Sequence, residues 1–384
     1  MKRIRIAPRP DWRETAEQFG FGFHTFDGEP YWDESAYYQF SLAQIENDLE
    51  DPTREIHEMC LDLVARVVDS EQWLEKLAIP AQYRDFVRRS WKERQPHLYG
   101  RMDLSYDGHG PAKLLETNYD TPTSLYEASI FQYLWLDQQI QRGQLPSESD
   151  QFNSLEEKLT DLFRGLFIET PFYFSSVKGS VEDRGTVEYL RDIAREAGLQ
   201  THLIDIEDIG LDTRGTFVDE SNAPIRTLFK LYPWEHMFQE EFGAAIEKSG
   251  TLFIEPAWKS ILSNKGALAL LWELHEGHPN LLPTFFDADP TQPLANGWVR
   301  KPFFSREGAN IDIRTDNGRR VYQNGPYGSG PSVLQKFHPL PCFEGHYTVI
   351  GSWMIGDQPA GIGIREDDSL ITKDTSRFLP HIIR

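Results

Sequence analysis

Oxygen-bearing side chains are concentrated in LETNYD, residues 115–120. The stretch continues an apolar, strand-like segment, although strands disfavour Asn and Asp. A second strand-like segment, RMDLSY at 101–106, precedes it, and DGHG at 107–110 lies between the two. Two strands that flank a glycine-containing turn are typical of a β-hairpin. We therefore expect these oxygens to serve chemistry at the end of a hairpin.

Residues two apart on a strand share a face, so Arg101 and Asp103 point the same way. Glu116, Asn118 and, if the strand continues, Asp120 do the same. If the strands pair, Asp103, Glu116 and Asn118 converge. Two carboxylates and an amide oxygen are hard ligands of the kind that Mg²⁺ takes, together with water and phosphates, and Arg101 could neutralise a transferring phosphoryl group. The alternative is a solvated sheet face with an Arg–Asp pair.

Cations follow much later in the chain. In WVRKPFFSREGANIDI, residues 298–313, Lys301 ends a strand and a loop with Gly308 follows. Backbone N–H groups of such a loop can cradle phosphates that Lys301 also reaches, although the P-loop pattern is missing. The alternative is an ordinary loop between strands.

Two further cations stand at element ends. Lys265 follows a Ser-Asn N-cap, where the helix dipole disfavours a cation unless an anion faces it. Otherwise Lys265 is a surface lysine. Arg365 ends the apolar strand GIGIRED, 361–367, and is either paired with the adjacent Glu366 or a second cation for a reacting phosphate.

Other catalytic signatures do not fit. His275 and His278 fall one residue short of HExxH, and no GxSxG motif occurs. The two cysteines, Cys60 and Cys342, form neither a CxxC motif nor a disulfide framework, and Cys60 falls in an apolar helical pattern.

The charge balance excludes several partners. The 384 residues include 60 acidic and 39 basic side chains, a formal net charge of -21. Nucleic acid and anionic membranes require a basic footprint, so we expect neither as a partner. An acidic surface suits a cationic substrate such as an amine, or it serves only solubility. Without a signal-like start or a long apolar run, we expect a cytoplasmic protein.

The pattern of elements predicts a mixed α+β and α/β fold in three closely packed regions: a mostly helical region 1–95, an α/β region 96–250 that includes the hairpin, and a strand-rich region 251–384. In the first, residues 34–68 read as helical, with a break at Asp51-Pro52. Strand, helix and strand between 171 and 206 suggest a crossover unit and a parallel sheet.

Five segments together resemble the synthetase domain of the glutathionylspermidine synthase family. They are YGRMDLSYDGHGPAKLLETNYDTPTSLYEA, KLYPWEHM, FIEPAWKSILSNKGALALLWELHEGHPNLLP, RKPFFSREGANI and AGIGIRED. Each is weak alone, but they occur in the same order over most of the chain. The size is similar to that of stand-alone members described as acid–amine ligases.

The resemblance implies a permuted ATP-grasp fold, in which a nucleotide lies between two antiparallel sheets. It implies that Asp103, Glu116 and Asn118 are ligands of Mg²⁺, and that Arg101 lies beside the transferring phosphate. It also implies that Lys265 and Lys301 bind the ATP phosphates, and that Arg365 is a late arginine near the reaction centre. We add Gln335 and Phe337 for the adenine side. Glu235 is a candidate for holding the amine or the acid, or else part of a packed strand end.

The implied reaction has two steps. A substrate carboxylate attacks the γ-phosphate of ATP, and an amine then attacks the acyl phosphate to leave an amide. No segment matches the amidase region of the bifunctional members, so we expect no hydrolysis of glutathionylspermidine. The acid and the amine, a glutathione-like peptide and a polyamine in the named family, stay open for this chain. Two other hypotheses remain: a non-catalytic nucleotide-binding protein with the same shell, and a metal hydrolase that works without ATP.

Overall fold

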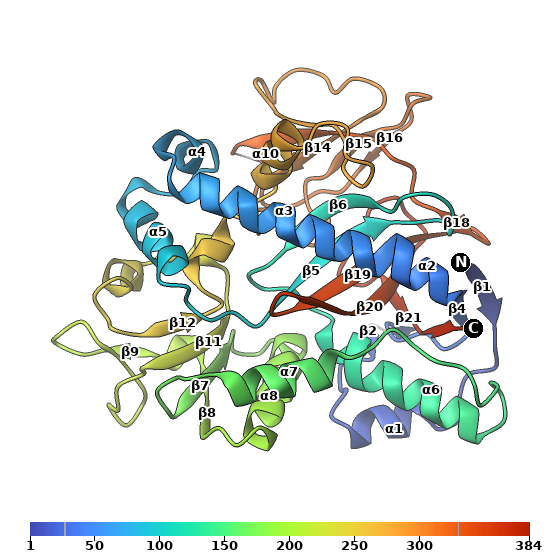
Figure 1. Ribbon diagram of the computed structural model, residues 1–384, viewed down its shortest axis with the longest axis horizontal. Coiled ribbons are helices and arrows are strands. Elements are labelled where there is room, and N and C mark those ends of the chain that lie inside the picture. The colour runs from blue at the N-terminus through green and yellow to red at the C-terminus, as the bar shows by residue number, and fades with distance from the viewer. Residues whose placement is uncertain (27, 329) are drawn as a thin grey trace.

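The centre of the molecule is an antiparallel sheet with strand order β21-β20-β19-β5-β6, in which β18 also pairs with β19 (Figure 1). The computed structural model describes residues 1–26, 28–328 and 330–384. We call this sheet the β19 sheet. Its strands are β5 (Tyr99–Ser105), β6 (Lys113–Asn118), β18 (Cys342–Phe343), β19 (His346–Ile355), β20 (Gln358–Asp367) and β21 (Arg377–Leu379).

A second antiparallel sheet, the β14 sheet, has the order β13-β17-β14-β15-β16 and lies at the top of Figure 1. The short strands predicted in the last third of the chain are therefore confirmed, divided between two sheets. The strands are β13 (Thr284–Phe286), β14 (Trp298–Pro302), β15 (Asp312–Arg314), β16 (Arg320–Tyr322) and β17 (Ser332–Lys336).

The predicted parallel sheet is also confirmed, and we call it the β11 sheet. Its order is β12-β11-β7-β8, and all its pairings are parallel. Helix α8 (Val181–Glu196) connects β7 to β8 and packs on β7, with α7 (Leu155–Gly165) beside it. The strands are β7 (Phe172–Ser176), β8 (Thr201–Asp205), β11 (Thr227–Leu231) and β12 (Leu252–Ile254). Between β8 and β12 lie η4 (Ile206–Asp208), β9 (Gly210–Leu211), β10 (Phe217–Val218), α9 (Trp234–Met237) and η5 (Glu241–Ala245).

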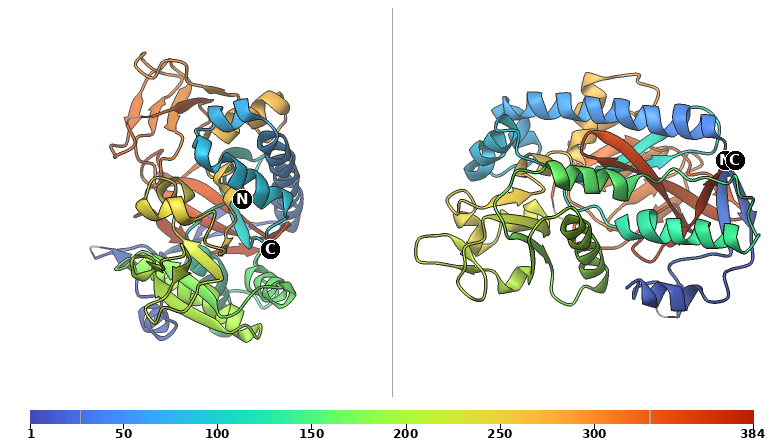
Figure 2. Two further views of the ribbon diagram at one scale, coloured as in Figure 1. Left: turned by 90° about the vertical axis from the view of Figure 1, so that its left-hand side faces the viewer. Right: turned by 60° about the horizontal axis from the view of Figure 1, so that its bottom comes forward.

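The two ends of the chain share a small sheet of order β1-β4-β22, so N and C lie side by side (Figures 1 and 2). Its strands are β1 (Lys2–Arg5), β4 (Ala36–Phe40) and β22 (His381–Ile383). Our helical interpretation of residues 34–41 was therefore wrong. Tyr37, Tyr38 and Phe40 are buried, and aromatic residues of this kind favour a strand packed on both faces. Between β1 and β4 lie α1 (Trp12–Gln18), β2 (Thr25–Phe26) and β3 (Glu29–Pro30).

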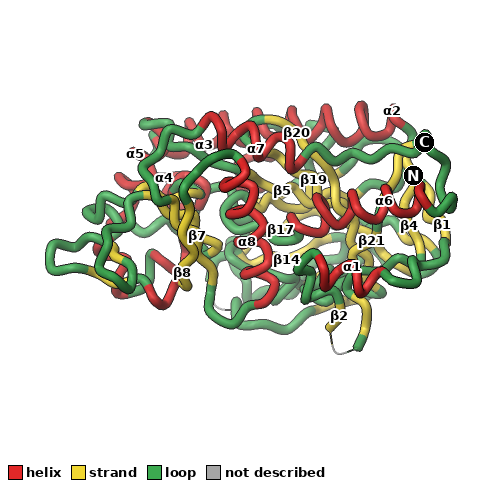
Figure 3. Tube along the Cα trace, turned by 90° about the horizontal axis from the view of Figure 1, so that it is seen from below, coloured by secondary structure: helices red, strands yellow, loops and turns green. Residues whose placement is uncertain are grey.

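A long helical segment covers one face of the β19 sheet, as the view from below shows (Figure 3). It starts at Ser41, which forms a capping box with Gln44. It then runs without a break through α2 (Leu42–Ile45), the π-helical turn η1 (Glu46–Glu50) and α3 (Asp51–Val68). The predicted break at Pro52 was wrong, because Pro52 lies at the start of α3, directly after the π-helical turn.

The remaining helices complete the layers around the sheets. They are α4 (Glu71–Lys76), η2 (Ala81–Tyr83), α5 (Arg84–Lys92), η3 (Glu127–Phe131), α6 (Gln132–Gln141), η6 (Ala257–Ser260) and α10 (Gly266–Leu274). The predicted apolar stripe of α3 is buried, including Cys60, Leu63 and Val64, and it packs with Met102 and Leu104 of β5. Because side chains alternate along a strand, Arg101 and Asp103, which alternate with Met102 and Leu104, face away from α3.

Candidate active site

The hairpin residues that face away from α3 are Arg101 and Asp103 on β5. Across the ladder, Asp103 is opposite Glu116 and Arg101 is opposite Asn118. Directly opposite residues lie about 5 Å apart at Cβ. The structure thus brings the four polar side chains of the hairpin to one place, as the alternation predicts.

Asp120 does not join them, because β6 ends at Asn118. Its fully buried carboxylate lies 2.5 Å from Nζ of Lys230 on β11, and it accepts a 2.8 Å hydrogen bond from the backbone N–H of Trp234. Asp120 therefore ties the hairpin to the β11 sheet and is not a ligand in the cleft.

Ion pairs hold the hairpin carboxylates. Arg101 donates two hydrogen bonds to Asp103, of 2.7 and 3.1 Å. Burial raises the pKa of Asp103, although Arg101 opposes this. Glu116 accepts a 3.2 Å hydrogen bond from Asn118 and lies 3.2 Å from Nζ of Lys265. Burial alone would raise the pKa of Glu116, but Lys265 and Lys301 outweigh it and lower this pKa to about 2.

Lys265, just before α10, and Lys301, on β14, face the hairpin from outside the β19 sheet. Lys301, on β14, donates to the carbonyl of Leu115 at 2.8 Å, and Lys265 donates to the carbonyl of Ser305 at 2.5 Å. Lys265 occupies the N-cap position of α10, one residue earlier than the predicted first turn. Burial, together with the charge of Lys265, lowers the pKa of Lys301 to about 8, although Glu116 opposes this. Glu116 is the main anion that faces both lysines, with a smaller contribution from Asp103 at Lys301, so the two cations could balance further negative charge.

A cleft with about 780 Å³ of open space, counting the part continuous with solvent, lies between the β19 and β14 sheets. Seven of the predicted residues line it: Asp103, Glu116, Lys265, Lys301, Gly308, Gln335 and Phe337. Apolar side chains complete the walls, among them Leu282, Val299, Ile311 and Ile313. The cleft therefore has a charged end at the hairpin and an apolar slot, a combination that suits a ligand with a phosphate chain and a flat ring.

A second, smaller hollow adjoins the cleft and shares Asp103, Val349 and Thr372 with it. Arg101 and Arg365 both line this hollow, together with Ser124. Arg365 donates to the carbonyls of Lys373 and Asp374. It does not pair with Glu366, so that alternative is not what the structure shows.

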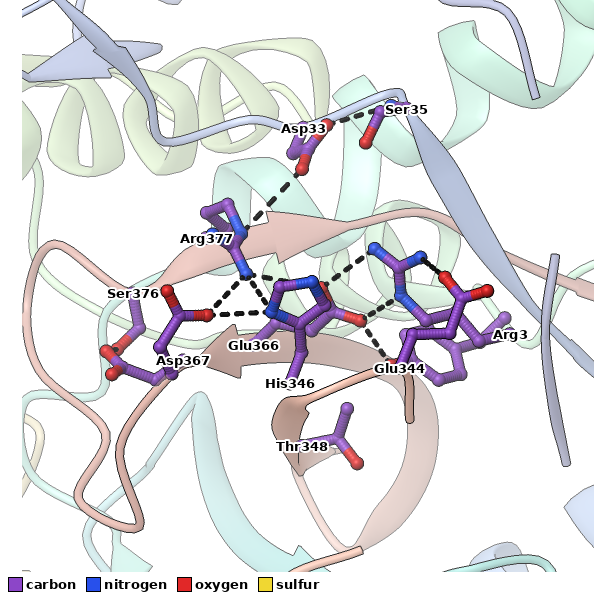
Figure 4. A network of polar contacts seen from close by, with 12 residues as sticks. Arg3, Asp33, Ser35, Glu344, His346, Thr348, Glu366, Asp367, Ser376 and Arg377 are labelled. Atoms are coloured by element: carbon purple, nitrogen blue, oxygen red, sulfur yellow. Dashed lines mark hydrogen bonds and ion pairs between the residues drawn. The ribbon is translucent and has the colours of Figure 1, made fainter. Parts of the chain in front are cut away.

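Glu366 instead belongs to a separate network (Figure 4). It accepts hydrogen bonds from Arg3 and Tyr38, and Arg377 approaches its other oxygen at 3.7 Å. This network anchors the end of β20 to the N-terminal strand β1, and it leaves the adjacent Arg365 free to face the hollow.

Glu235 lies outside both the cleft and the hollow. Its carboxylate pairs with Arg306 at 2.6 Å, and Arg306 also donates to Thr121 at 2.7 Å. Arg306 belongs to the same loop as Gly308, so Glu235 holds that loop against α9 and the end of the hairpin.

The loop around Gly308 that the sequence indicated also provides Ser305 and Glu307 to the cleft. Sequence reasoning missed Leu370, Ile371 and Thr372, because they belong to the irregular connection after β20. Ser124 has a left-handed backbone, with φ of +71°, which the sequence does not signal because the residue is not glycine.

The hairpin donor set fits Mg²⁺. In the described parts of the chain, no group of three or more His, Cys, Asp or Glu side chains could hold a metal by itself. Two carboxylates and one amide oxygen remain, and Mg²⁺ commonly binds one or two carboxylates and takes its other ligands from water and substrate phosphates.

The same described residues contain no helix long and apolar enough to span a membrane.

The sequence profile of the family described as "Glutathionylspermidine synthase preATP-grasp" matches residues 3–384. The chain belongs to this glutathionylspermidine synthase family. A Haemophilus influenzae protein named "Putative acid--amine ligase" is 39% identical over 396 residues, which cover 99% of each chain.

Other members of the glutathionylspermidine synthase family are longer. Trypanothione synthetase of Crithidia fasciculata is 27% identical over 84% of this chain, and the match covers 53% of that protein. The bifunctional glutathionylspermidine synthetase/amidase of Escherichia coli is 25% identical over 90% of this chain, and the match covers 59% of that protein. This chain therefore spans little more than half the length of these two relatives.

A solved structure supports the fold. A glutathione synthetase-like effector from Globodera pallida has a TM-score of 0.58 and 11% identity, with 98% of both chains covered. At this identity the likeness concerns the mixed α/β fold alone.

Proposed function

We propose that this chain is an ATP- and Mg²⁺-dependent ligase that joins a carboxylate to an amine through an acyl phosphate, with release of ADP. One observation carries the proposal: Glu116, Lys265 and Lys301 face one another in a cleft between two antiparallel sheets. Family membership and the named ligase relatives support it. A permuted ATP-grasp fold is part of this proposal, and the order in the chain, with the carboxylate-bearing hairpin before the sheet that contains Lys301, supports it.

In this proposal, Lys265 and Lys301 bind the ATP phosphates, the backbone around Gly308 covers them, and Gln335 and Phe337 lie on the adenine side. Asp103, Glu116 and Asn118 hold Mg²⁺, which would supply positive charge to the phosphate oxygens. Phosphoryl transfer depends mostly on positioning and charge stabilisation, and the buried cations supply both.

The acid is bound in the hollow, where Arg101 and Arg365 orient its carboxylate toward the γ-phosphate. The carboxylate attacks the γ-phosphate, and the acyl phosphate forms. An uncharged amine then attacks the acyl carbon, and phosphate leaves. A glutathione-like peptide and a polyamine are the proposed substrate classes, because the names of several relatives combine the two. A cytoplasmic setting is part of the proposal and suits the two free cysteines.

Product analysis tests this function. The protein is incubated with ATP, Mg²⁺ and a panel of carboxylates, glutathione included, each combined with spermidine or other amines, and ADP and amide are measured by mass spectrometry. We expect ADP and amide in equal amounts with at least one pair. Asp103→Asn and Lys301→Met should abolish both products, whereas Lys248→Met, at an exposed position, should not. Nucleotide binding without ADP across the panel would instead identify a non-catalytic ATP-grasp-like protein.

A further inference from the structure

Ser124 lines the hollow together with Arg101 and Arg365. Its left-handed backbone is uncommon for a residue with a side chain, and such strain persists only where the surroundings impose it. Arg101 donates to the carbonyl of the preceding residue, Thr123, at 2.7 Å. Ser124 is thus fixed in the lining of the hollow that also contains the two arginines proposed to orient the acid.

A hydrogen-bonded chain leads from this hydroxyl into the core. Ser124 Oγ lies 3.3 Å from the hydroxyl of Tyr31, and that hydroxyl donates to Oε1 of Glu127 at 2.5 Å. Tyr31 is 1% exposed and Glu127 is fully buried. These three oxygens form a continuous path from the hollow to a carboxylate.

The other oxygen of Glu127 makes no hydrogen bond within the described residues. A buried carboxylate oxygen without a partner is costly, so a structural role alone explains this group poorly. An ionised carboxylate held in this way gains from taking up a proton. A proton passed along the path arrives at Oε1, which Tyr31 faces, and the hydrogen bond then runs from Glu127 to Tyr31.

The charges around Glu127 come from three elements. Arg365 of β20 and Arg101 of β5 favour the ionised form of Glu127. The charge of Glu182 of α8 favours the protonated form of Tyr31. Burial raises the pKa of Glu127 above its usual range, against the hydrogen bond from Tyr31 and the two arginines. Burial, with Glu127 nearby, raises the pKa of Glu182 to about 8, against Arg365. Glu127 is therefore a stronger base than an exposed glutamate.

We propose that Ser124, Tyr31 and Glu127 form a proton relay that deprotonates the amine substrate as it approaches the acyl group held in the hollow. This inference rests on the proposed function, because an amine arrives mainly as an ammonium ion and must lose a proton before it attacks the acyl phosphate. Ser124 touches the substrate, and Tyr31 and Glu127 act through it.

The proton balance is complete. The ammonium ion gives a proton to Ser124 Oγ, Ser124 gives its hydroxyl proton to Tyr31, and Tyr31 gives its own to Glu127. The nitrogen lone pair forms the C–N bond, the C–O bond to phosphate breaks, and phosphate leaves with that electron pair. The second nitrogen proton is lost to phosphate. Glu127 returns its proton by the same path after the product leaves.

The relay is tested with two nucleophiles, spermidine and hydroxylamine, and with the carboxylate that supports ADP formation in the panel above. Hydroxylamine is largely uncharged at neutral pH and does not need deprotonation before attack. We expect Tyr31→Phe and Glu127→Gln to lower the rate with spermidine about 100-fold. With hydroxylamine, both variants should stay within about threefold of the wild type. Tyr126→Phe is the matched control, because buried Tyr126 donates to the carbonyl of Phe19 and not to the relay.

The pH profile gives a second readout. As the pH rises, more spermidine is uncharged, so the defect of both variants should shrink. An equal loss with both nucleophiles, or a defect that does not change with pH, overturns the relay while the ligase remains established. Wild-type protein without ADP formation in any combination instead removes the proposed function itself. Thermal melting shows that the variants are folded, and Tyr31→Phe tests the relay even if Glu127→Gln does not fold.

Discussion

Oε2 of Glu116 lies 3.2 Å from Nζ of Lys265, although one residue lies on strand β6 of the early hairpin and the other precedes α10. Without nucleotide, the carboxylate balances the charge of the lysine. A bound polyphosphate would take over the lysine, and the carboxylate would then be free for Mg²⁺. The cleft thus contains a charge pair that a ligand must exchange.

Glu116→Gln should therefore lower kcat/KM for ATP by about 100-fold or more, because the neutral amide balances neither Lys265 nor a metal ion. The same change should weaken Mg²⁺ binding, so that a higher metal concentration is needed for the half-maximal rate. Asp312→Asn is the control, since Asp312 pairs with Arg320 in the β14 sheet and does not line the cleft. Equal effects of the two variants would contradict the assigned site.

Gly308→Ala should weaken ATP binding about tenfold, measured by calorimetry. A Cβ at Gly308 would lie 2.4 Å from Cγ2 of Ile371 and 2.6 Å from the carbonyl oxygen of Thr372, so one wall of the cleft must shift. The control is Gly277→Ala, whose φ of +84° imposes similar backbone strain but whose Cβ would meet nothing within 4 Å. Backbone strain should cost both variants about 1–2 kcal/mol of unfolding free energy. The clash should add to this loss in Gly308→Ala, and only that variant should lose affinity.

Lys230→Met should lower the free energy of unfolding by about 3–5 kcal/mol, because it leaves the carboxylate of Asp120 buried without its cation. Adding Asp120→Asn should recover part of this loss. The comparison is Lys178→Met, since Lys178 is mostly exposed where it pairs with Asp208, and its loss should cost much less stability. Urea denaturation measures all three. Similar losses at both lysines would show that burial is not what makes the Lys230 pair important.

A thiol reagent should modify Cys342 quickly and Cys60 only after denaturation. Cys342 is exposed, whereas burial in the α3 face raises the pKa of Cys60 to about 12, and the thiolate is the reactive form. One thiol should therefore be counted in the folded protein and two in denaturant. Cys342→Ser should leave none in the folded state.

Acid should destabilise the fold through His381. Burial lowers its pKa from 6.5 to about 3, and its Nε2 accepts a hydrogen bond from the backbone N–H of Phe152. Below pH 6.5 the unfolded chain binds a proton that the folded chain does not, so stability falls as the pH drops. The loss at pH 5 should be about 2 kcal/mol, and His381→Gln should flatten this slope in urea titrations at several pH values. An unchanged slope would show that His381 is not the responsible group.

Periodicity predicted the elements that position the site, because hairpin, crossover and helix faces are local patterns. It could not predict which distant partner each polar side chain meets. Asp120 continues the polar run of the hairpin, but Lys230 captures it. Glu235 was a candidate substrate ligand, but its carboxylate forms an ion pair with Arg306. Residues 34–41 were assigned as helix because the helical pattern that follows was extended too far back, whereas pairing with β1 and β22 makes Ala36–Phe40 a strand.

The place of β5 in the β19 sheet sets a demand on folding. β5 pairs with β19, yet the whole β11 and β14 sheets lie between them in the chain. Bringing such distant strands together closes a very long loop, which is slow. Until β19 arrives, one edge of the hairpin is open, and open edges promote aggregation. Slow synthesis at low temperature should therefore yield more native protein than rapid overproduction.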